Sequence, residues 1–356
     1  MKRIITVIGA RPQFVKAATV SREFKLLGID EKIIHTGQHY DANMSDLFFE
    51  EMNIPQPCYN LNIHGLSHGA MTGRMLEKIE EILIKERPDG VLVYGDTNST
   101  LAGALAAAKL NIPVIHVEAG LRSFNTGMPE EINRVLTDRI SKFLFCPTDA
   151  AVENLNKEGF RSLPVEIYKS GDVMQDAALF YGSKAEMEST ILNQIGLQEF
   201  VLATVHRQEN TDNPKNLRNI IQGLNAMNRL IPVVVPIHPR TKEMLNQLQI
   251  VPEFKLIEPV GYLDMIMLLK SCKMVVTDSG GLQKEAFFFE KNCITLREQT
   301  EWVELVQNGF NILVGSDSNR LMEAFEFLKA KQSDFNIDFY GNGQAAKIIA
   351  ETIYRI

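Results

Sequence analysis

Three carboxylates in the first half of the chain have the type and spacing to move protons on a bound substrate. They are Asp96 in Y-G-D-T-N-S-T, Glu118 in H-V-E-A-G-L-R and Glu130 in M-P-E-E-I-N-R. Each is expected on a loop or in the first turn of a helix, so the three could converge on one substrate as general acids and bases. The alternatives are a helix cap for Asp96 and, for Glu130, a role beside Glu131 in complementing a helix dipole, with Glu131 and Arg134 spaced to pair. Glu118 is harder to explain structurally, because a charged residue that closes a buried strand needs a partner.

The motif G-A-R-P-Q-F-V-K, at residues 9–16, could bind an anion. Gly9 permits a tight turn, and Pro12 suits the first position of a helix. Arg11 and Lys16 would then bring two cations to a helix N-terminus, whose free N–H groups already favour anions. This spacing predicts a diphosphate clamp. The alternative is an ordinary strand-to-helix turn that carries surface cations.

A second candidate for anion binding is T-D-S-G-G-L-Q-K-E-A, which directly follows an apolar run. Ser279, Gly280 and Gly281 can present successive backbone N–H groups to phosphate oxygens. Glu285 lies further along the expected helix, where it could accept hydrogen bonds from ribose hydroxyls. The alternative is that Asp278 or Ser279 is a plain helix cap.

Two histidine motifs in the second half follow predicted strands. H-R-Q-E-N brings together His206, Arg207 and Glu209, and H-P-R places His238 in a similar but weaker setting. Alone, His206 is more often an ordinary hydrogen-bonding residue than a catalyst. The neighbouring cation and carboxylate favour a role in a ligand cleft.

These residues lie between short β-branched or aliphatic runs that alternate with helical patterns. Such alternation predicts βαβ units, and therefore parallel sheets with right-handed crossovers. In parallel sheets the chemistry collects on loops after the carboxyl ends of the strands. The expected strands are residues 4–8, 32–35, 90–94, 113–117, 143–146 and 165–169, then 200–204, 233–236, 255–257, 274–277, 293–296 and 311–314.

The same rhythm in both halves predicts an α/β protein with two Rossmann-like, doubly wound domains that face a cleft. We expect an N-terminal domain at residues 1–181 with the catalytic carboxylates and a C-terminal domain at residues 182–340. The helix within residues 341–356 is expected to pack back on the first domain. Residues 172–198 read as two helices separated by a Gly-Ser-Lys break at Gly182.

Composition excludes several classes of protein. The 356 residues are 45% hydrophobic and 23% charged, which predicts a folded, soluble protein of about two domains. A net charge of −7 without a block of Lys or Arg argues against nucleic-acid or membrane-surface binding. With neither a signal peptide nor an apolar run of about 18 residues, we expect a cytoplasmic protein. The four dispersed cysteines are expected to be reduced thiols, mostly buried.

The sequence contains patterns that partly match dinucleotide-binding and zinc-binding motifs, but none of them meets all the requirements of its motif. G-N-G-Q-A-A at residues 341–346 matches a dinucleotide pattern, but the C-terminus follows too soon for a βαβ unit, so we reject nicotinamide binding. The spaced pairs His35/His39 and His64/His68 lack the H-E-x-x-H pattern of a zinc site. We therefore expect neither a metal ion nor another cofactor.

Taken together, the motifs resemble those of the non-hydrolysing UDP-N-acetylglucosamine 2-epimerases. The resemblance covers essentially the whole chain and rests, in order, on G-A-R-P-Q, G-D-T-N-S-T, H-V-E-A-G-L-R-S, P-E-E-I-N-R, H-R-x-E-N, T-D-S-G-G-x-Q-x-E-A, R-E-x-T-E-W-V-E and Y-G-N-G-Q-A. A-R-P-Q-F, L-R-S-F and T-E-W-V-E look most similar to a branch that acts on UDP-2,3-diacetamido-2,3-dideoxy-glucuronate for surface polysaccharides. The stretch after Gln38 and His39 differs from that of relatives activated by UDP-N-acetylglucosamine.

The resemblance implies a fold of the GT-B glycosyltransferase type, a homodimer and a UDP-sugar ligand, without metal or nicotinamide. It places Arg11, His238, Ser279, Gly280 and Gly281 at the diphosphate, Glu285 at the ribose, and the loop 260–265 with Tyr262 at the uracil. It also places Asp96, Glu118 and Glu130 around the sugar, matches His206 to an essential histidine beside Arg207, and matches Lys16, Arg134 and Arg297 to further cleft positions.

The implied activity is inversion of C2 in a UDP-2-acetamido sugar, such as UDP-N-acetylglucosamine to UDP-N-acetylmannosamine. The expected route is anti elimination of UDP and its re-addition through a 2-acetamidoglucal, with Asp96 and Glu130 as the leading candidates for the acid and base, in either order. One alternative is the same chemistry on the diacetamido-glucuronate. More remote alternatives are a hydrolysing epimerase, a GT-B glycosyltransferase and a nucleotide-sugar sensor without catalysis.

Overall fold

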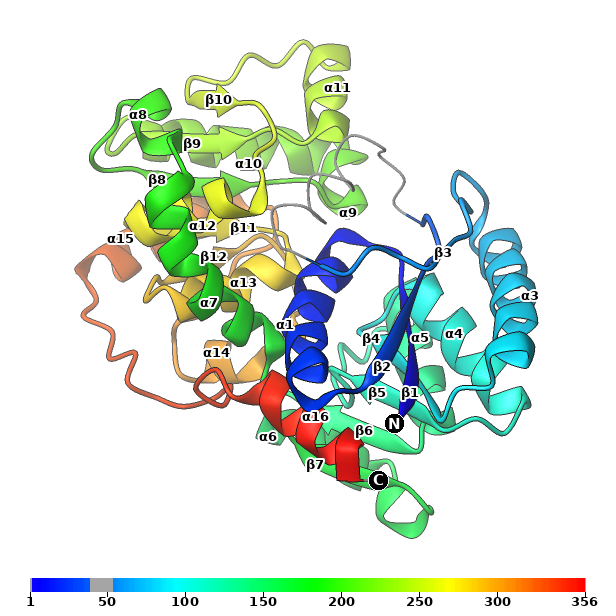
Figure 1. The fold of residues 1–356 in the computed structure, drawn as a ribbon. Coiled ribbons are helices and arrows are strands. Elements are labelled where there is room, and N and C mark those ends of the chain that lie inside the picture. Colours follow the sequence, from blue (N-terminus) through cyan, green and yellow to red (C-terminus); the bar gives the residue numbers. More distant parts are fainter. Residues whose placement is uncertain (1, 39–53, 356) are drawn as a thin grey trace. The chain divides into compact units, whose positions relative to one another are not determined.

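The computed structural model describes residues 2–38 and 54–355, except for the side chain of Arg11. The chain forms two compact units: an N-terminal unit of Met1–Ala177 with Asp338–Ile356, and a C-terminal unit of Ala178–Ile337. In the N-terminal unit, helix α16 packs against helix α1 (Figure 1). Among the helices that the structure describes, none is both long and apolar enough to cross a membrane.

The N-terminal unit is built on a parallel sheet of seven strands in the order β3-β2-β1-β4-β5-β6-β7 (Figure 1). From β1 the chain moves outward through β2 to β3 and then returns to β4 on the other side of β1. Thr6 at the centre of β1 lies opposite Ile33 of β2 and Leu92 of β4. The strands are β1 Arg3–Ile8, β2 Asp30–His35, β3 Tyr59–Asn60, β4 Gly90–Tyr94, β5 Val114–Val117, β6 Phe143–Cys146 and β7 Glu166–Lys169.

Helices α3 and α4 cover the face of this sheet that carries Ile5, Val7 and Val91. Thr97 begins α4 as an N-cap, because its side chain accepts a hydrogen bond from the N–H of Thr100 at 3.2 Å. The helices of this unit are α1 Arg11–Leu27, α3 His68–Glu86, α4 Asn98–Lys109, α5 Pro129–Ile140, α6 Asp149–Lys157 and α16 Ala345–Arg355, with a 3₁₀ turn at Phe160–Ser162.

The C-terminal unit repeats this design with a parallel sheet of six strands in the order β10-β9-β8-β11-β12-β13. The strands are β8 Val201–Thr204, β9 Val233–Pro236, β10 Lys255–Ile257, β11 Met274–Thr277, β12 Cys293–Thr295 and β13 Asn311–Leu313. The helices are α8 Ile191–Ile195, α9 Gln208–Thr211, α10 Pro214–Asn228, α11 Pro239–Gln247, α12 Tyr262–Ser271, α13 Gly280–Phe288, α14 Val303–Gln307 and α15 Ser318–Ala330.

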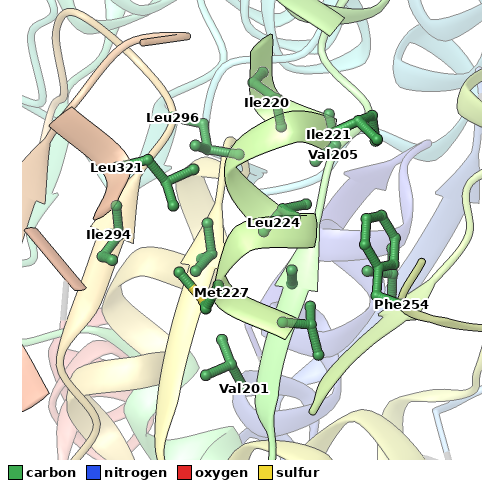
Figure 2. Packing of buried hydrophobic residues seen from close by; sticks show 14 of the residues in the cluster. Val201, Val205, Ile220, Ile221, Leu224, Met227, Phe254, Ile294, Leu296 and Leu321 are labelled. Carbon is green, nitrogen blue, oxygen red and sulfur yellow. The ribbon is translucent and has the colours of Figure 1, made fainter. Parts of the chain in front are cut away.

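Alternation along these strands builds two apolar layers, one on each face of the sheet. Val201 and Val276 belong to the layer under α10 and α15, whereas Leu202 and Val275 belong to the layer with α12 and α13. Leu224 and the rest of the inner face of α10 lie directly over the strands in Figure 2. Because both faces are covered, the strands read as continuous apolar runs.

All twelve predicted strands are confirmed, with ends that differ by two residues or fewer. The strand β3 was not predicted. It has only two residues, Tyr59 and Asn60, and pairs with Ile34 and His35 of β2. A strand this short has no alternating pattern, so only its position beside β2 defines it.

The predicted helix break at residues 182–184 is wrong, because α7 (Val173–Glu188) runs through it. A glycine inside a helix costs only about 1 kcal/mol relative to alanine. Tyr181, which is 2% exposed, packs in this turn and helps to offset that cost. The break lies instead at Ser189 and Thr190, between the end of α7 and the start of α8 at Ile191, where the hydroxyl of Ser189 accepts a hydrogen bond from the N–H of Ile191 at 3.3 Å.

The loop after β1 leaves no room for a side chain at Gly9. An added Cβ would overlap Oγ1 of Thr36 and Oγ of Ser99, which are hydrogen-bonded to each other at 2.8 Å. The Oε1 atom of Gln38 also accepts hydrogen bonds from the hydroxyl of Ser99 at 2.7 Å and from its N–H at 3.0 Å. Because this closed site cannot relax cheaply, we expect Gly9→Ala to lower the free energy of unfolding by about 1–3 kcal/mol. Urea denaturation measures this difference.

Gly73 provides a matched control for Gly9→Ala. It lies inside α3, and an added Cβ at this position would have no neighbour within 4 Å. Gly73→Ala should therefore raise the unfolding free energy by up to about 1 kcal/mol through helix propensity. Equal unfolding midpoints for Gly9→Ala and the parent protein would contradict the steric argument.

Candidate functional site

Each sheet reverses its strand order at one place, between β1 and β4 in the N-terminal unit and between β8 and β11 in the C-terminal unit. Doubly wound sheets bind ligands at this place, beyond the carboxyl ends of the strands. The predicted site residues follow the four strands concerned: Arg11 and Lys16 after β1, Asp96 after β4, His206 and Arg207 after β8, and Ser279, Gly280 and Gly281 after β11.

Gln13 joins the two loops at the reversal of the first sheet. Its Oε1 accepts hydrogen bonds from the N–H groups of Gly9 at 2.8 Å and Ala10 at 3.1 Å. Its Nε2 donates to the carbonyl of Tyr94 at 2.8 Å and to the hydroxyl of Thr100 at 2.9 Å. Gln13 was not among the site residues predicted from the sequence. The available signal was a glutamine at the third helical position, from which an amide can reach back to the helix start.

Lys16 and Glu118 form a buried ion pair at the carboxyl edge of the first sheet. Their side chains are only 8% and 10% exposed. The prediction that Glu118 needs a partner is thereby confirmed. Glu118 has a φ of 73°, in the left-handed region, which an L-residue occupies only when its surroundings enforce it. The side chain of Arg11 lies outside the described part of the structure, as does His39.

Asp96 is held by two side chains of helix α5. Its carboxylate pairs with Nη2 of Arg134 at 2.5 Å, and its carbonyl accepts a hydrogen bond from Nδ2 of Asn133 at 2.9 Å. The Asp96 side chain keeps 28% of its surface exposed, so it can still reach a ligand. Asn133 was not a candidate in the sequence, although P-E-E-I-N-R contains it.

The neighbours Glu130 and Glu131 have different environments in the first turn of α5. Glu131 is buried and accepts hydrogen bonds from the N–H groups of Ser123 and Phe124, both at 2.9 Å, and from Arg134 at 3.0 Å. Burial alone would raise the pKa of Glu131, but these donors lower it overall. Glu131 therefore shapes the loop before α5, while Glu130 is half-buried and makes no ion pair with any residue that the structure describes.

In the C-terminal unit, the buried carboxylate of Asp278 organises the loop after β8. It accepts hydrogen bonds from the N–H groups of His206 and Arg207, both at 3.0 Å, and from Nδ2 of Asn210 at 3.1 Å. The Nδ1 atom of His206 lies 3.2 Å from the same carboxylate, and the ring is still 37% exposed. Asp278 is therefore an anchor for His206 and Arg207, and not the helix cap that the sequence analysis considered.

The N-terminus of α13 has a cation beside it and close side chains around it. Ser279 is the N-cap, as one sequence alternative proposed, and its side chain accepts from the N–H of Leu282 at 3.5 Å. A Cβ on Gly280 would lie 2.5 Å from Oε1 of Glu301 and 3.7 Å from Nη2 of Arg207. The carboxylate of Glu301 and the guanidinium of Arg207 therefore both lie beside the first turn of the helix.

The remaining predicted residues lie on neighbouring elements of the C-terminal unit. The ring of His238, the N-cap of α11, lies 5.6 Å from that of His206. Arg297 follows β12, is 4% exposed and pairs with Glu301 at 3.0 Å. Glu285 is 8% exposed on α13, and Tyr262 begins α12 with 8% exposure.

Two fully buried aspartates are expected to make the free energy of unfolding depend on pH in the acid range. Burial alone would raise the pKa of Asp278, but the hydrogen bond and charge of His206 and the N–H of Arg207 lower it overall. Burial likewise acts against the ionisation of Asp138 in α5, and His116 and Arg122 outweigh it, so its pKa is also lowered. Both carboxylates are therefore ionised in the folded protein above about pH 4.

We expect the free energy of unfolding to fall as the pH drops below about 4. The folded-state pKa values are lower than the unfolded ones, so the unfolded state binds more protons in this range. The stabilisation is present above the unfolded pKa and is lost as the pH falls through the folded pKa. Urea midpoints from pH 7 to pH 3 measure it, and Asp278→Asn should show a shallower slope. An identical slope in that variant would contradict the assignment.

Comparison with known proteins identifies the family of the chain. The family model described as UDP-N-acetylglucosamine 2-epimerase matches residues 24–354. The chain is 53% identical to the UDP-2,3-diacetamido-2,3-dideoxy-D-glucuronate 2-epimerase of Pseudomonas aeruginosa, over 99% of this chain and 100% of that protein. It is 44% identical to the UDP-N-acetylglucosamine 2-epimerase of Methanocaldococcus jannaschii, over 99% of this chain and 98% of that protein.

Solved structures show the same fold. A crystal structure of the M. jannaschii UDP-GlcNAc 2-epimerase in complex with UDP-GlcNAc and UDP matches with a TM-score of 0.92 and 43% identity, over 100% of both chains. The Neisseria meningitidis UDP-GlcNAc 2-epimerase bound to UDP-GlcNAc matches with a TM-score of 0.88 and 32% identity, over 99% of this chain and 100% of that chain. The predicted pair of Rossmann-like domains of the GT-B type is confirmed. With a family match along nearly its whole length, the chain belongs to the UDP-N-acetylglucosamine 2-epimerases, a family of isomerases.

Proposed function

We propose that the protein inverts C2 of a UDP-2-acetamido sugar without hydrolysing it. The observation that carries the proposal is that groups able to transfer protons lie at one strand reversal and groups able to bind a diphosphate lie at the other. The first brings together Asp96, with Arg134 on its carboxylate, and the Lys16–Glu118 pair. The second presents a helix N-terminus with Arg207 beside it, which suits a diphosphate.

The reaction needs a route other than direct deprotonation, because C2 of the sugar is not adjacent to a carbonyl group. In the proposed route a base removes the C2 proton, the C2–H electron pair forms a C1=C2 double bond, and the C1–O bond breaks. UDP leaves with the electron pair of the C1–O bond, which gives a 2-acetamidoglucal. UDP then adds back to C1 while a proton reaches the opposite face of C2, so atoms and electrons balance without an oxidant.

We assign the diphosphate to the C-terminal unit. The N–H groups of Gly280 and Gly281 and the cation of Arg207 would stabilise the charge that develops on departing UDP. Ser279 was predicted to add a third N–H group, but that group already donates to the hydroxyl of Thr277 at 2.9 Å. His206, held by Asp278 and near His238, would contact the same phosphates. Arg11 would add a cation from the start of α1. We assign Glu285 to the ribose, the loop 260–265 to the uracil and Arg297 to a supporting position.

We assign proton transfer to Asp96 and Glu130. Arg134 holds the Asp96 carboxylate in place and 28% of the Asp96 side chain stays exposed, so we assign Asp96 to removal of the C2 proton. Glu130 is half-buried and makes no ion pair with any described residue, and we assign it to proton delivery at the opposite face. Lys16 and Glu118 would orient the sugar between them. The reverse reaction exchanges the two roles.

Two substrates remain as specific candidates. The 53% identity to the P. aeruginosa enzyme, over the full length of both chains, favours UDP-2,3-diacetamido-2,3-dideoxy-glucuronate. The 44% identity to the M. jannaschii enzyme supports UDP-N-acetylglucosamine as the second candidate. In either case we propose a cytoplasmic homodimer that supplies a sugar nucleotide for surface polysaccharides.

Proton NMR in D₂O tests the function. The purified enzyme is incubated first with UDP-N-acetylglucosamine and then with the diacetamido-glucuronate, and deuterium entry at C2 and the manno epimer are followed. Exchange with either sugar supports the proposal and identifies the substrate. Release of free N-acetylmannosamine would indicate a hydrolysing epimerase. Binding without exchange of either sugar would overturn the proposal in favour of a transferase or a sensor.

A further inference from the structure

A buried histidine outside the proposed reacting groups lies directly behind Asp96. His116 belongs to β5 and is 0% exposed. Its Nδ1 lies 2.7 Å from Oδ1 of Asp138, and its Nε2 lies 2.8 Å from the carbonyl oxygen of Gly95, the residue before Asp96. Both ring nitrogens therefore face oxygen atoms at hydrogen-bond distance.

These two oxygens determine which protons the ring carries. A peptide carbonyl such as that of Gly95 only accepts hydrogen bonds. The carboxylate of Asp138 is also an acceptor, because its other oxygen accepts from Nη1 of Arg122 at 2.7 Å and from the N–H of Gly120 at 3.1 Å. A neutral imidazole has one N–H and one lone pair, so it would direct a lone pair at one of these oxygens. Only the imidazolium donates to both.

The charges around the ring also favour the protonated form of His116. Asp138 and Glu158 are anionic, and Arg122 binds both, with its Nε and Nη2 each 2.7 Å from an oxygen of Glu158. With His116 protonated, two cations balance two anions in this cluster. A neutral His116 would leave the cluster with an uncompensated negative charge in a largely buried site, which is unfavourable.

The consequence for Asp96 follows from the geometry of one peptide. The carbonyl of Gly95 and the N–H of Asp96 belong to the same planar unit, so the group that holds the carbonyl also sets the orientation of the Asp96 backbone. The N–H of Gly95 donates to the carbonyl of Val117 at 3.0 Å, so β5 holds Gly95 on both sides. Asn133 holds the carbonyl of Asp96 from α5.

We infer that His116 is a permanently charged positioning residue, whose imidazolium fixes the Gly95–Asp96 peptide and thereby aims the proposed base. It does not touch the substrate, because it is fully buried. The kinetic part of this inference rests on the proposed function. The protonation of His116 does not depend on it, so the two can fail separately.

Nitrogen NMR of the intact protein tests the protonation. Spectra of protein labelled with ¹⁵N-histidine distinguish protonated from unprotonated ring nitrogens for the seven histidines of the chain. We expect one histidine to keep both nitrogens protonated at pH 8.5, where exposed histidines are neutral. That signal should be absent from His116→Gln. If every histidine is neutral at pH 8.5, the inference is overturned, and this outcome requires no folded variant.

Kinetics test the positioning role. His116→Gln should lower kcat on the order of 10²-fold, because a displaced catalytic group can cost this much. The KM and the affinity for UDP should change little, since His116 contacts neither the sugar nor the nucleotide in the proposed function. His64→Gln, at an exposed histidine, provides the matched control and should retain parental kcat. A folded His116→Gln protein with parental kcat, or one that loses only UDP affinity, would overturn the positioning role.

Discussion

Asp96→Asn and Glu130→Gln should each lower the rate of C2 epimerisation by about 10²–10⁴-fold, the usual contribution of a general acid or base. Each substitution preserves shape and removes the ability to exchange a proton at neutral pH. In Asp96→Asn the loss should include deuterium exchange at C2, because Asp96 is assigned to proton removal and sits on the Arg134 guanidinium. NMR in D₂O measures exchange and epimer formation in one experiment.

The control for these variants is Glu153→Gln on α6. The side chain of Glu153 is 56% exposed and pairs only loosely with Lys157 at 3.5 Å, so the change should leave turnover at the parental value. UDP binding should persist in Asp96→Asn and Glu130→Gln, because the diphosphate is assigned to the other unit. Near-parental turnover in both variants would refute the assignment of proton transfer to these carboxylates.

Asp278→Asn should have the largest combined effect on stability and ligand binding. The carboxylate is 0% exposed and accepts hydrogen bonds from four donors of the loop after β8, among them the N–H groups of His206 and Arg207. An amide would place its own N–H₂ group among these donors and remove a buried charge from beside His206. We expect a loss of about 3 kcal/mol in the free energy of unfolding, because buried donors are left without an acceptor.

Displacement of this loop should also weaken the binding of UDP. Without Asp278, neither the His206 ring nor the Arg207 cation is held beside the start of α13, so we expect affinity to fall at least about tenfold, which corresponds to about 1.4 kcal/mol. Calorimetric titration with UDP and urea denaturation give the two quantities. Asp149→Asn is the matched control, since that side chain is 84% exposed and should change either by little. Parental stability with parental UDP affinity in Asp278→Asn would contradict the anchoring role.

Local sequence could not predict which of Glu130 and Glu131 would be buried and which would be accessible. Both glutamates follow Pro129 at the start of an expected helix, and both suit its dipole. Which of them is buried depends on the loop at Ser123 and Phe124, which folds back to donate two N–H groups to Glu131. Neighbouring positions on a helix differ by about 100° in direction, so packing alone separates a structural carboxylate from an accessible one.

The sequence also could not predict which residues far apart in the chain would pair with each other. Lys16 and Glu118 are 102 positions apart, and Gln13 and Thr100 are 87 apart. Each pair is polar and buried, so each side chain needs a partner, and Glu118 was expected to have one. The identity of the partner follows from strand order, because β1, β4 and β5 are neighbours in the sheet although they are distant in the chain.

The sequence by itself determined every described strand except β3, the parallel architecture and the loops that carry the chemistry. Apolar runs between helical patterns can be buried only as a sheet covered on both faces, and polar residues after such runs must collect at one edge. Tertiary structure alone decided which of those residues meet: Asp278 anchors His206, Arg134 pairs with Asp96, and His116 lies between two acceptors. The physical reason is that local patterns report burial and backbone conformation, whereas hydrogen bonds and charge pairs form only after the strands are in register.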